Sequence, residues 1–208
     1  MKDSLIALGV FLLGIVLGIS GLLPTDAVPA DLTEWLLYAL VVQIGVSLGA
    51  SGNLRHIAKS FSFQTMLLPF ATISGTLMLT AIAGLVLGGW QLADYLAVGS
   101  GMGYYSLSSV LIMDIKSDDM GVEMATQLGV LAVMVNIIRE MLALVCGPWL
   151  ARVFGRYAPV SAAGVTSMDV TLPMIVKSTG QEMFPIALMH GMVLEAAVPL
   201  LVTLFAGL

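Results

Sequence analysis

Long apolar runs dominate this sequence, and they constrain its fold more than any other feature. They lie at 5–23, 36–50, 64–90, 124–149 and 184–207. About 20 helical residues are needed to cross a hydrocarbon core of about 30 Å, and most of these runs approach or exceed that length. We therefore predict an all-α integral membrane protein, with one transmembrane domain over residues 1–208 and about five membrane helices at these runs.

The composition excludes other classes of protein. Charged residues make up 10% of the 208 residues, against about 25% in a typical soluble domain, which argues against a soluble enzyme or a disordered regulator. A net charge of −5 with eight basic residues argues against a nucleic-acid partner. One cysteine excludes a disulfide framework, and two histidines far apart in the sequence do not indicate zinc. We expect no metal and no cofactor.

The first apolar run has two interpretations. Lys2, the apolar stretch and the small residues of AVPA at 27–30 loosely resemble a signal peptide. The run of 5–23 is longer than the usual apolar region of about 7–15 residues, which favours a first membrane helix.

Two further segments, 95–113 and 162–176, are apolar but rich in Gly, Ser and Thr. We predict that each is a helix that breaks within the membrane and re-enters, because broken backbone at that depth needs protein or a water-filled cavity to satisfy it. With both segments re-entrant, six basic residues lie in the cytoplasm (Lys2, Arg55, Lys59, Arg152, Arg156 and Lys177). Lys116 then lies outside, in an external loop at 114–123, and full spanning of both segments gives a less asymmetric count. The N-terminus is then cytoplasmic and the C-terminus external.

The two odd segments also resemble each other. Gly103, Ser106 and Leu111 align with Gly164, Ser167 and Leu172, and Ser108 falls opposite Asp169. Because the two segments enter from opposite sides in the re-entrant topology, this similarity indicates an inverted repeat. Secondary transporters place substrate and ion sites where such broken helices meet.

Asp169 is the first candidate functional residue. A charge at the membrane centre costs at least about 2.5–3.5 kcal/mol, so it is retained where it is paired, hydrated or functional. Ser167 and Thr166 lie beside it and can supply hydroxyl ligands. We predict a cation or proton site, and the alternative is a loop-end carboxylate at the headgroup level.

Asn136, Arg139 and Glu140 form a second group, at helical spacings that place them roughly on one face. Arg139 and Glu140 are either a structural ion pair or part of a gate or substrate clamp. Asn136 is placed to bond the backbone of a broken helix.

Hydroxyl groups and a histidine complete the candidates. Tyr105, Ser106 and Ser108 of the first segment suit replacement of a cation's hydration shell, or else close helix packing. His190 in the last run is either a proton relay or a histidine held by a neighbour.

Four motifs give the chain a resemblance to a known family. GYYSLSS at 103–109, NIIRE at 136–140, GVTSMDVTLP at 164–173 and ALMHG at 187–191 resemble the bacterial lysine exporter family. The resemblance implies secondary export of L-lysine and of analogues such as thialysine from the bacterial cytoplasm across the inner membrane. It also implies eight spans and an intramembrane acidic pair, of which Asp169 matches one member.

The other member of that pair belongs to an N-terminal region of about three spans, which this chain does not match. The resemblance therefore implies one subunit of a split exporter, completed by a small companion membrane protein, or else a fragment or a homo-oligomer. Protons are the expected coupling ion, and lipid surrounds the helices. Two alternatives stay open: an intramembrane hydrolase that pairs Ser106 or Ser108 with His190, and a passive channel or scaffold.

Overall fold

The computed structural model describes residues 9, 12–14, 16–20 and 63–208, and these residues contain helices and no strand. The first group is helical and lies within the predicted first span, whereas the predicted span 36–50 lies outside the described residues. Residues 62–208 form a compact unit of their own. Its elements are α4 (Phe63–Leu87), α5 (Leu92–Gly99), α6 (Tyr105–Met120), α7 (Val122–Phe154), α8 (Ala158–Ala163), η2 (Gly164–Met168), α9 (Leu172–Thr179), η3 (Gln181–Met183) and α10 (Phe184–Ala206).

Three stretches of the described chain are long and apolar enough to cross a membrane. They are Thr65–Leu87, Val122–Phe154 and Gln181–Ala206, close to the predicted runs 64–90, 124–149 and 184–207. Each contains a proline (Pro69, Pro148 and Pro199), which membrane helices tolerate because neighbouring groups satisfy the freed carbonyl. The all-helical membrane class is therefore confirmed.

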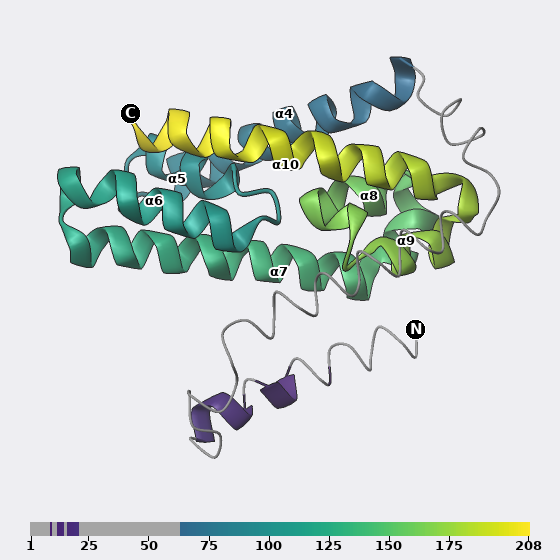
Figure 1. Cartoon of the computed structure of the whole chain (residues 1–208), viewed down its shortest axis with the longest axis horizontal. Helices are drawn as coiled ribbons and strands as arrows, with labels where there is room; N and C mark the ends of the chain where they lie inside the picture. Colours follow the sequence, from purple (N-terminus) through teal and green to yellow (C-terminus); the bar gives the residue numbers. More distant parts are fainter. Residues whose placement is uncertain (1–8, 10–11, 15, 21–62) are drawn as a thin grey trace. The chain divides into compact units, whose positions relative to one another are not determined.

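The short helices form two hairpins at opposite ends of the long ones (Figure 1). In that view α5 and α6 lie at the left end of α7 and α10, and α8 and α9 lie at the right end. The chain of each hairpin runs inward, breaks near the middle of the long helices and returns. Both segments that the sequence marks as broken helices are broken in the structure, between α5 and α6 and between α8 and α9.

The predicted loop at 114–123 is wrong. Helix α6 continues through this polar stretch to Met120, and α7 begins after a one-residue turn at Gly121, whose φ is 82°. The physical reason is that Lys116 is buried and paired with Asp94 of α5, so its charge does not require a solvated loop.

The core fills the space among the hairpins and the long helices. Its buried members are Ala97, Val98, Met102, Ile112, Leu128, Ala132, Val165, Leu194, Val198, Val202 and Ala206. The opposite faces of the long helices carry exposed apolar side chains, for example Phe70 and Leu79 on α4 and Ile138 and Leu142 on α7. Such faces suit contact with lipid.

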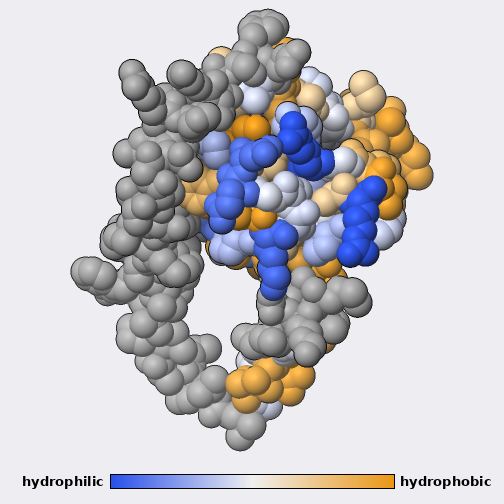
Figure 2. All heavy atoms as spheres, turned by 90° about the vertical axis from the view of Figure 1, so that its right-hand side faces the viewer, coloured by the Kyte–Doolittle hydropathy of each residue, from blue (hydrophilic) through white to orange (hydrophobic). Residues whose placement is uncertain are grey.

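The two ends of this unit differ in charge. The end where α7 finishes near α9 faces the viewer in Figure 2, which shows several hydrophilic side chains gathered there with apolar ones beside them. Exposed Arg152, Arg156 and Lys177 belong to this end, where Arg156 pairs with Glu182 at 3.2 Å. The other end, around the α6–α7 turn, exposes acidic side chains: Asp114, Asp118, Asp119 and Glu123.

Candidate functional site

The two helix breaks touch each other near the middle of the long helices. The backbone N–H of Val165 donates to the carbonyl of Met102, with an N···O distance of 2.9 Å. Gly103 and Gly164 have φ values of 101° and 68°, which side-chain-bearing residues rarely adopt. A methyl group on Gly164 would lie 2.1 Å from the Met102 carbonyl oxygen, and one on Gly103 would lie 3.1 Å from that of Ala163. The two glycines that align in the sequence are therefore the positions where the two backbones meet.

Asn136 of α7 holds the first break. Its Oδ1 accepts a hydrogen bond from the Gly103 backbone N–H at 2.7 Å, and its Nδ2 donates to the carbonyl of Ala132 at 2.8 Å. The side chain is fully buried, so these bonds satisfy polar groups that water does not reach. This is the bond to a broken-helix backbone that the sequence predicted.

Arg139, one turn further along α7, holds the second break. Its Nε donates to the carbonyl of Ala162 at 2.9 Å, and its Nη2 donates to that of Ser161 at 3.0 Å. Its Nη1 lies 3.4 Å from the hydroxyl of Thr76 on α4. These carbonyls belong to the last turn of α8, where a helix leaves acceptors without intrahelical partners.

The interpretation of Arg139 and Glu140 as an ion pair is wrong. No ion pair joins Arg139 to Glu140, whereas Lys116–Asp94 and Arg156–Glu182 do pair among the described residues. Consecutive residues project about 100° apart around a helix, so Arg139 reaches α8 while Glu140 faces elsewhere. Arg139 supports the broken backbone, and its role in a gate or substrate clamp stays a prediction.

Glu140 is a buried carboxylate without a counter-ion. Its side chain is 9% exposed and makes no hydrogen bond or ion pair within the described chain. It lies within electrostatic range of Asp169 and of the phenol of Tyr105. Asp169 follows η2 at the second break, is partly buried and lies within range of Glu195 on α10.

Glu140, Tyr105 and Glu195, from α7, α6 and α10, therefore each lie within electrostatic range of Asp169 beside the second break. No ion pair of the described residues neutralises Glu140 or Asp169. Unpaired carboxylates at membrane depth are stabilised by a positive charge or a proton. Among the described residues no three His, Cys, Asp or Glu side chains are grouped to hold a metal ion.

The predicted hydroxyl ligands mostly bond the backbone. Thr166 donates to the carbonyl of Ala163 at 3.0 Å, and buried Ser108 donates to that of Tyr104 at 2.8 Å. Ser106 has an exposed side chain. Their oxygens retain lone pairs, so a role as cation ligands stays a prediction.

His190 joins α10 to two other elements through a buried hydrogen-bond chain. Ser167 donates its hydroxyl proton to the Ala187 carbonyl at 3.0 Å, so it accepts from His190 Nδ1 at 3.1 Å. On the other side of the ring, the Thr72 hydroxyl lies 2.9 Å from Nε2 and also donates to the carbonyl of Leu68 at 3.0 Å. Thr72 also contacts the Ser161 hydroxyl at 2.8 Å.

These hydrogen bonds hold His190 between its neighbours. Neither Ser106 nor Ser108 bonds the ring, so the predicted Ser–His dyad does not form. Ser167, which does bond it, is fully buried. The role of His190 as a proton relay stays a prediction.

Sequence reasoning missed the α4 and α8 side chains that complete these networks. Thr72, Thr76 and Ser161 bond His190 and Arg139 directly or through one another. Isolated hydroxyls in an apolar run carry no pattern that marks them. Asp94, the partner of Lys116, was also missed because it stands alone between two apolar stretches.

Comparison with known proteins gives one consistent family. The family model described as "Lysine exporter LysO" matches residues 8–206. The "Lysine exporter LysO" of Escherichia coli (strain K12) is 29% identical over 206 residues, which are 99% of this chain and 64% of that protein. A "Putative lysine exporter" of Haemophilus influenzae is 36% identical over 112 residues, 54% of this chain and 53% of that protein. The chain thus spans less than two thirds of either relative, and no solved structure matches it.

Proposed function

Since this chain belongs to the lysine exporter LysO family, we propose that it exports L-lysine, and analogues such as thialysine, across the bacterial inner membrane in exchange for protons. The observation that carries the proposal is the pair of carboxylates, Glu140 and Asp169, beside the meeting point of two broken helices. Glu140 is buried without a counter-ion, and a cationic substrate or a proton supplies what it lacks.

The arrangement of the hairpins supports a two-sided pathway. The α5–α6 hairpin opens toward one end of the long helices and the α8–α9 hairpin toward the other (Figure 1). In an inverted repeat, such hairpins give the central site access from each side in turn. The exposed basic residues at the α8–α9 end favour a cytoplasmic location for that end, and thus an external C-terminus.

Asp169 is the proposed exchange residue. Moving Lys⁺ outward against an inside-negative potential costs about 2.3 kcal/mol per 100 mV. Returning one proton for each lysine cancels that net charge movement. A single carboxylate performs this exchange when the ammonium and the proton compete for it, with Glu140 adding negative charge and the nearby hydroxyls acting as secondary ligands.

A further membrane segment completes the proposed exporter. The chain spans 64% of the length of its Escherichia coli relative, so about a third of that protein has no counterpart here. We propose that a small companion membrane protein of about three spans, or a second copy of this chain, supplies it.

Uptake of labelled lysine into inverted vesicles tests the proposal. The vesicles carry the chain with and without a co-expressed companion, under an imposed proton gradient. Asp169→Asn is expected to abolish uptake while the protein stays inserted, because an amide binds neither the proton nor the ammonium. Glu182→Gln, a change to an exposed carboxylate at the bundle end, is the matched control and is expected to transport normally.

Two outcomes contradict the mechanism. If uptake survives Asp169→Asn, Asp169 is not the residue at which lysine and the proton exchange. If lysine flux does not depend on the proton gradient, the chain forms a passive pathway and does not exchange lysine for protons.

A further inference from the structure

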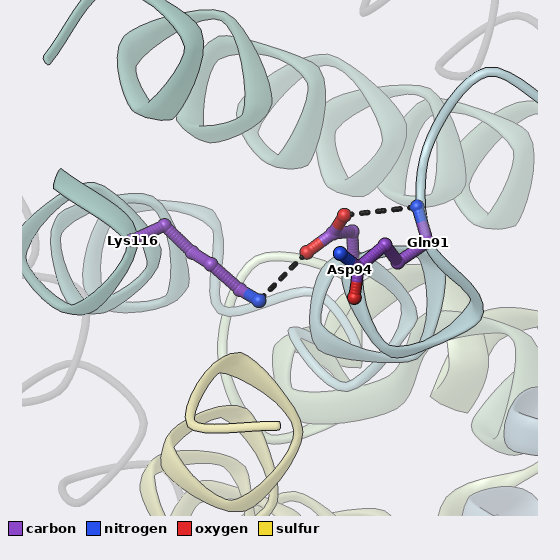
Figure 3. Close-up of polar contacts among 3 residues, drawn as sticks. All are labelled: Gln91, Asp94 and Lys116. Atoms are coloured by element: carbon purple, nitrogen blue, oxygen red, sulfur yellow. Dashed lines mark hydrogen bonds and ion pairs between the residues drawn. The ribbon is translucent and has the colours of Figure 1, made fainter. Parts of the chain in front are cut away.

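A second charged pair lies inside the described unit, away from the helix breaks. Lys116 of α6 reaches Asp94 of α5, with 2.9 Å between Nζ and Oδ1 (Figure 3). The two side chains are 4% and 2% exposed, respectively. The pair joins the two arms of the first hairpin and takes no part in the networks around Asn136, Arg139 and His190.

The partners of Asp94 make its second oxygen depend on a cation. Its Oδ2 accepts a hydrogen bond from the backbone N–H of Gln91 at 3.0 Å (Figure 3). Its Oδ1 pairs with the Lys116 ammonium at 2.9 Å and has no other partner among the described residues. If Lys116 withdrew, a buried carboxylate would be left without its counter-charge, which is strongly unfavourable. Another ammonium group would have to replace it.

The Asp94–Lys116 pair lies between the break of the α5–α6 hairpin and the open end of that hairpin. Asp94 precedes Gly101 at the break by seven residues, or about 10 Å along a helix axis at 1.5 Å per residue. Lys116 lies near the end of α6, beside the α6–α7 turn. The pair therefore lies between the central carboxylates and the end of the bundle that we assign to the outside.

We propose that Asp94 is a second binding station for the transported lysine, on the exit side, where the substrate ammonium exchanges with that of Lys116. This inference rests on the proposed export of lysine. The side chain of Lys116 is chemically the side chain of that substrate, so the structure displays how this part of the protein accommodates four methylene groups and an ammonium. Each exchange replaces one ammonium by another and keeps the buried charge balanced.

Lys116 has a second carboxylate within reach when it is displaced. Asp119 lies three residues further along α6 and is exposed. Residues three apart on a helix are neighbours, and a lysine stem is flexible enough to extend toward the surface. Lys116 thus acts as a tethered competitor, which helps lysine leave Asp94 and closes the station once it has left.

The rival role for the pair is a permanent clamp between α5 and α6. The double variant Asp94→Asn/Lys116→Met separates the two roles, because a buried ion pair replaced by uncharged groups of similar size is often no less stable. We expect this variant to insert normally and to export lysine about tenfold or more slowly than the unaltered chain. The matched control is Arg156→Met/Glu182→Gln, which removes the exposed ion pair and is expected to export normally.

Lys116→Arg gives a second test in a variant that keeps the ion pair. A guanidinium binds a carboxylate in a two-pronged geometry and exchanges with an ammonium less readily. Exchange at Asp94 predicts slower export with unchanged or higher thermal stability, whereas a clamp predicts normal export.

Binding to Asp94 is measured separately from transport. In purified Lys116→Met/Asp169→Asn, lysine and n-butylammonium are expected to raise the thermal unfolding midpoint, whereas norleucine, which is net neutral and lacks the side-chain ammonium, is not. Adding Asp94→Asn is expected to remove the response. The proposal is overturned if Asp94→Asn/Lys116→Met exports lysine within about twofold of the unaltered chain. It is also overturned if lysine does not raise the unfolding midpoint of Lys116→Met/Asp169→Asn. Absence of lysine export by the unaltered chain instead overturns the proposed function.

Discussion

Gly164→Ala tests whether the contact between the two helix breaks holds the described unit together. The added methyl group would lie 2.1 Å from the carbonyl oxygen of Met102, so the two backbones must separate. Backbone angles open mainly to glycine cost about 1–3 kcal/mol for another residue. Loss of the acceptor for the buried Val165 N–H adds about 1–3 kcal/mol. We expect a total destabilisation of about 2–6 kcal/mol.

Two other glycines separate these contributions. Gly155 has a φ of 89° with open space around it, so Gly155→Ala carries the backbone cost alone. Gly75 lies within α4 with open space and no positive φ, so Gly75→Ala is expected to be neutral or stabilising by up to about 1 kcal/mol. Thermal unfolding in detergent, followed by the reaction of Cys146 with a fluorogenic thiol reagent, ranks the three variants. A Gly164→Ala midpoint no lower than that of Gly155→Ala refutes the contact between the breaks.

Two further changes on α7 test the supports of the breaks. Asn136→Leu leaves the Gly103 N–H without a partner and is expected to cost about 1–3 kcal/mol in thermal unfolding, whereas Gln127→Leu at an exposed site of the same helix is expected to stay within about 0.5 kcal/mol. Arg139→Lys keeps the charge but loses the fork that serves two carbonyls, so it is expected to lower the unfolding midpoint and exposed Arg152→Lys is not. Equal midpoints for either variant and its control would contradict the role assigned here.

The long helices are predictable from the sequence because their signal is local. An apolar run needs no partner to be recognised, and the predicted 184–207 differs from α10 by one residue. The predicted end of the run 124–149 is too early, since α7 continues past Pro148 to Phe154. The glycine-rich composition likewise marks both breaks. Glycine lacks a Cβ and therefore adopts positive φ values without strain, and this freedom is visible in the sequence.

The partners across the fold are not predictable in this way. The sequence places Arg139 and Glu140 side by side, but the partners of Arg139 are two carbonyls of α8, more than twenty residues later in the chain. The charged stretch near Lys116 has the composition of a loop, but it is helical, and the partner of its buried lysine, Asp94, lies 22 residues earlier. A pairing over such a separation leaves no local pattern in the sequence.

The residues of the motif NIIRE lie on about one turn of α7, although the groups that they contact are far apart in the sequence. Asn136 bonds the first break, and Arg139, three residues later, bonds the end of α8 at the second. Glu140, in the next position, presents an unpaired carboxylate near Asp169. A rigid helix fixes the distances among these three groups. One turn of α7 therefore positions both backbone breaks and the Glu140 carboxylate relative to one another. Any movement of one hairpin against the other must therefore change its hydrogen bonds to this turn or the contact between Met102 and Val165, within a few residues of the carboxylates.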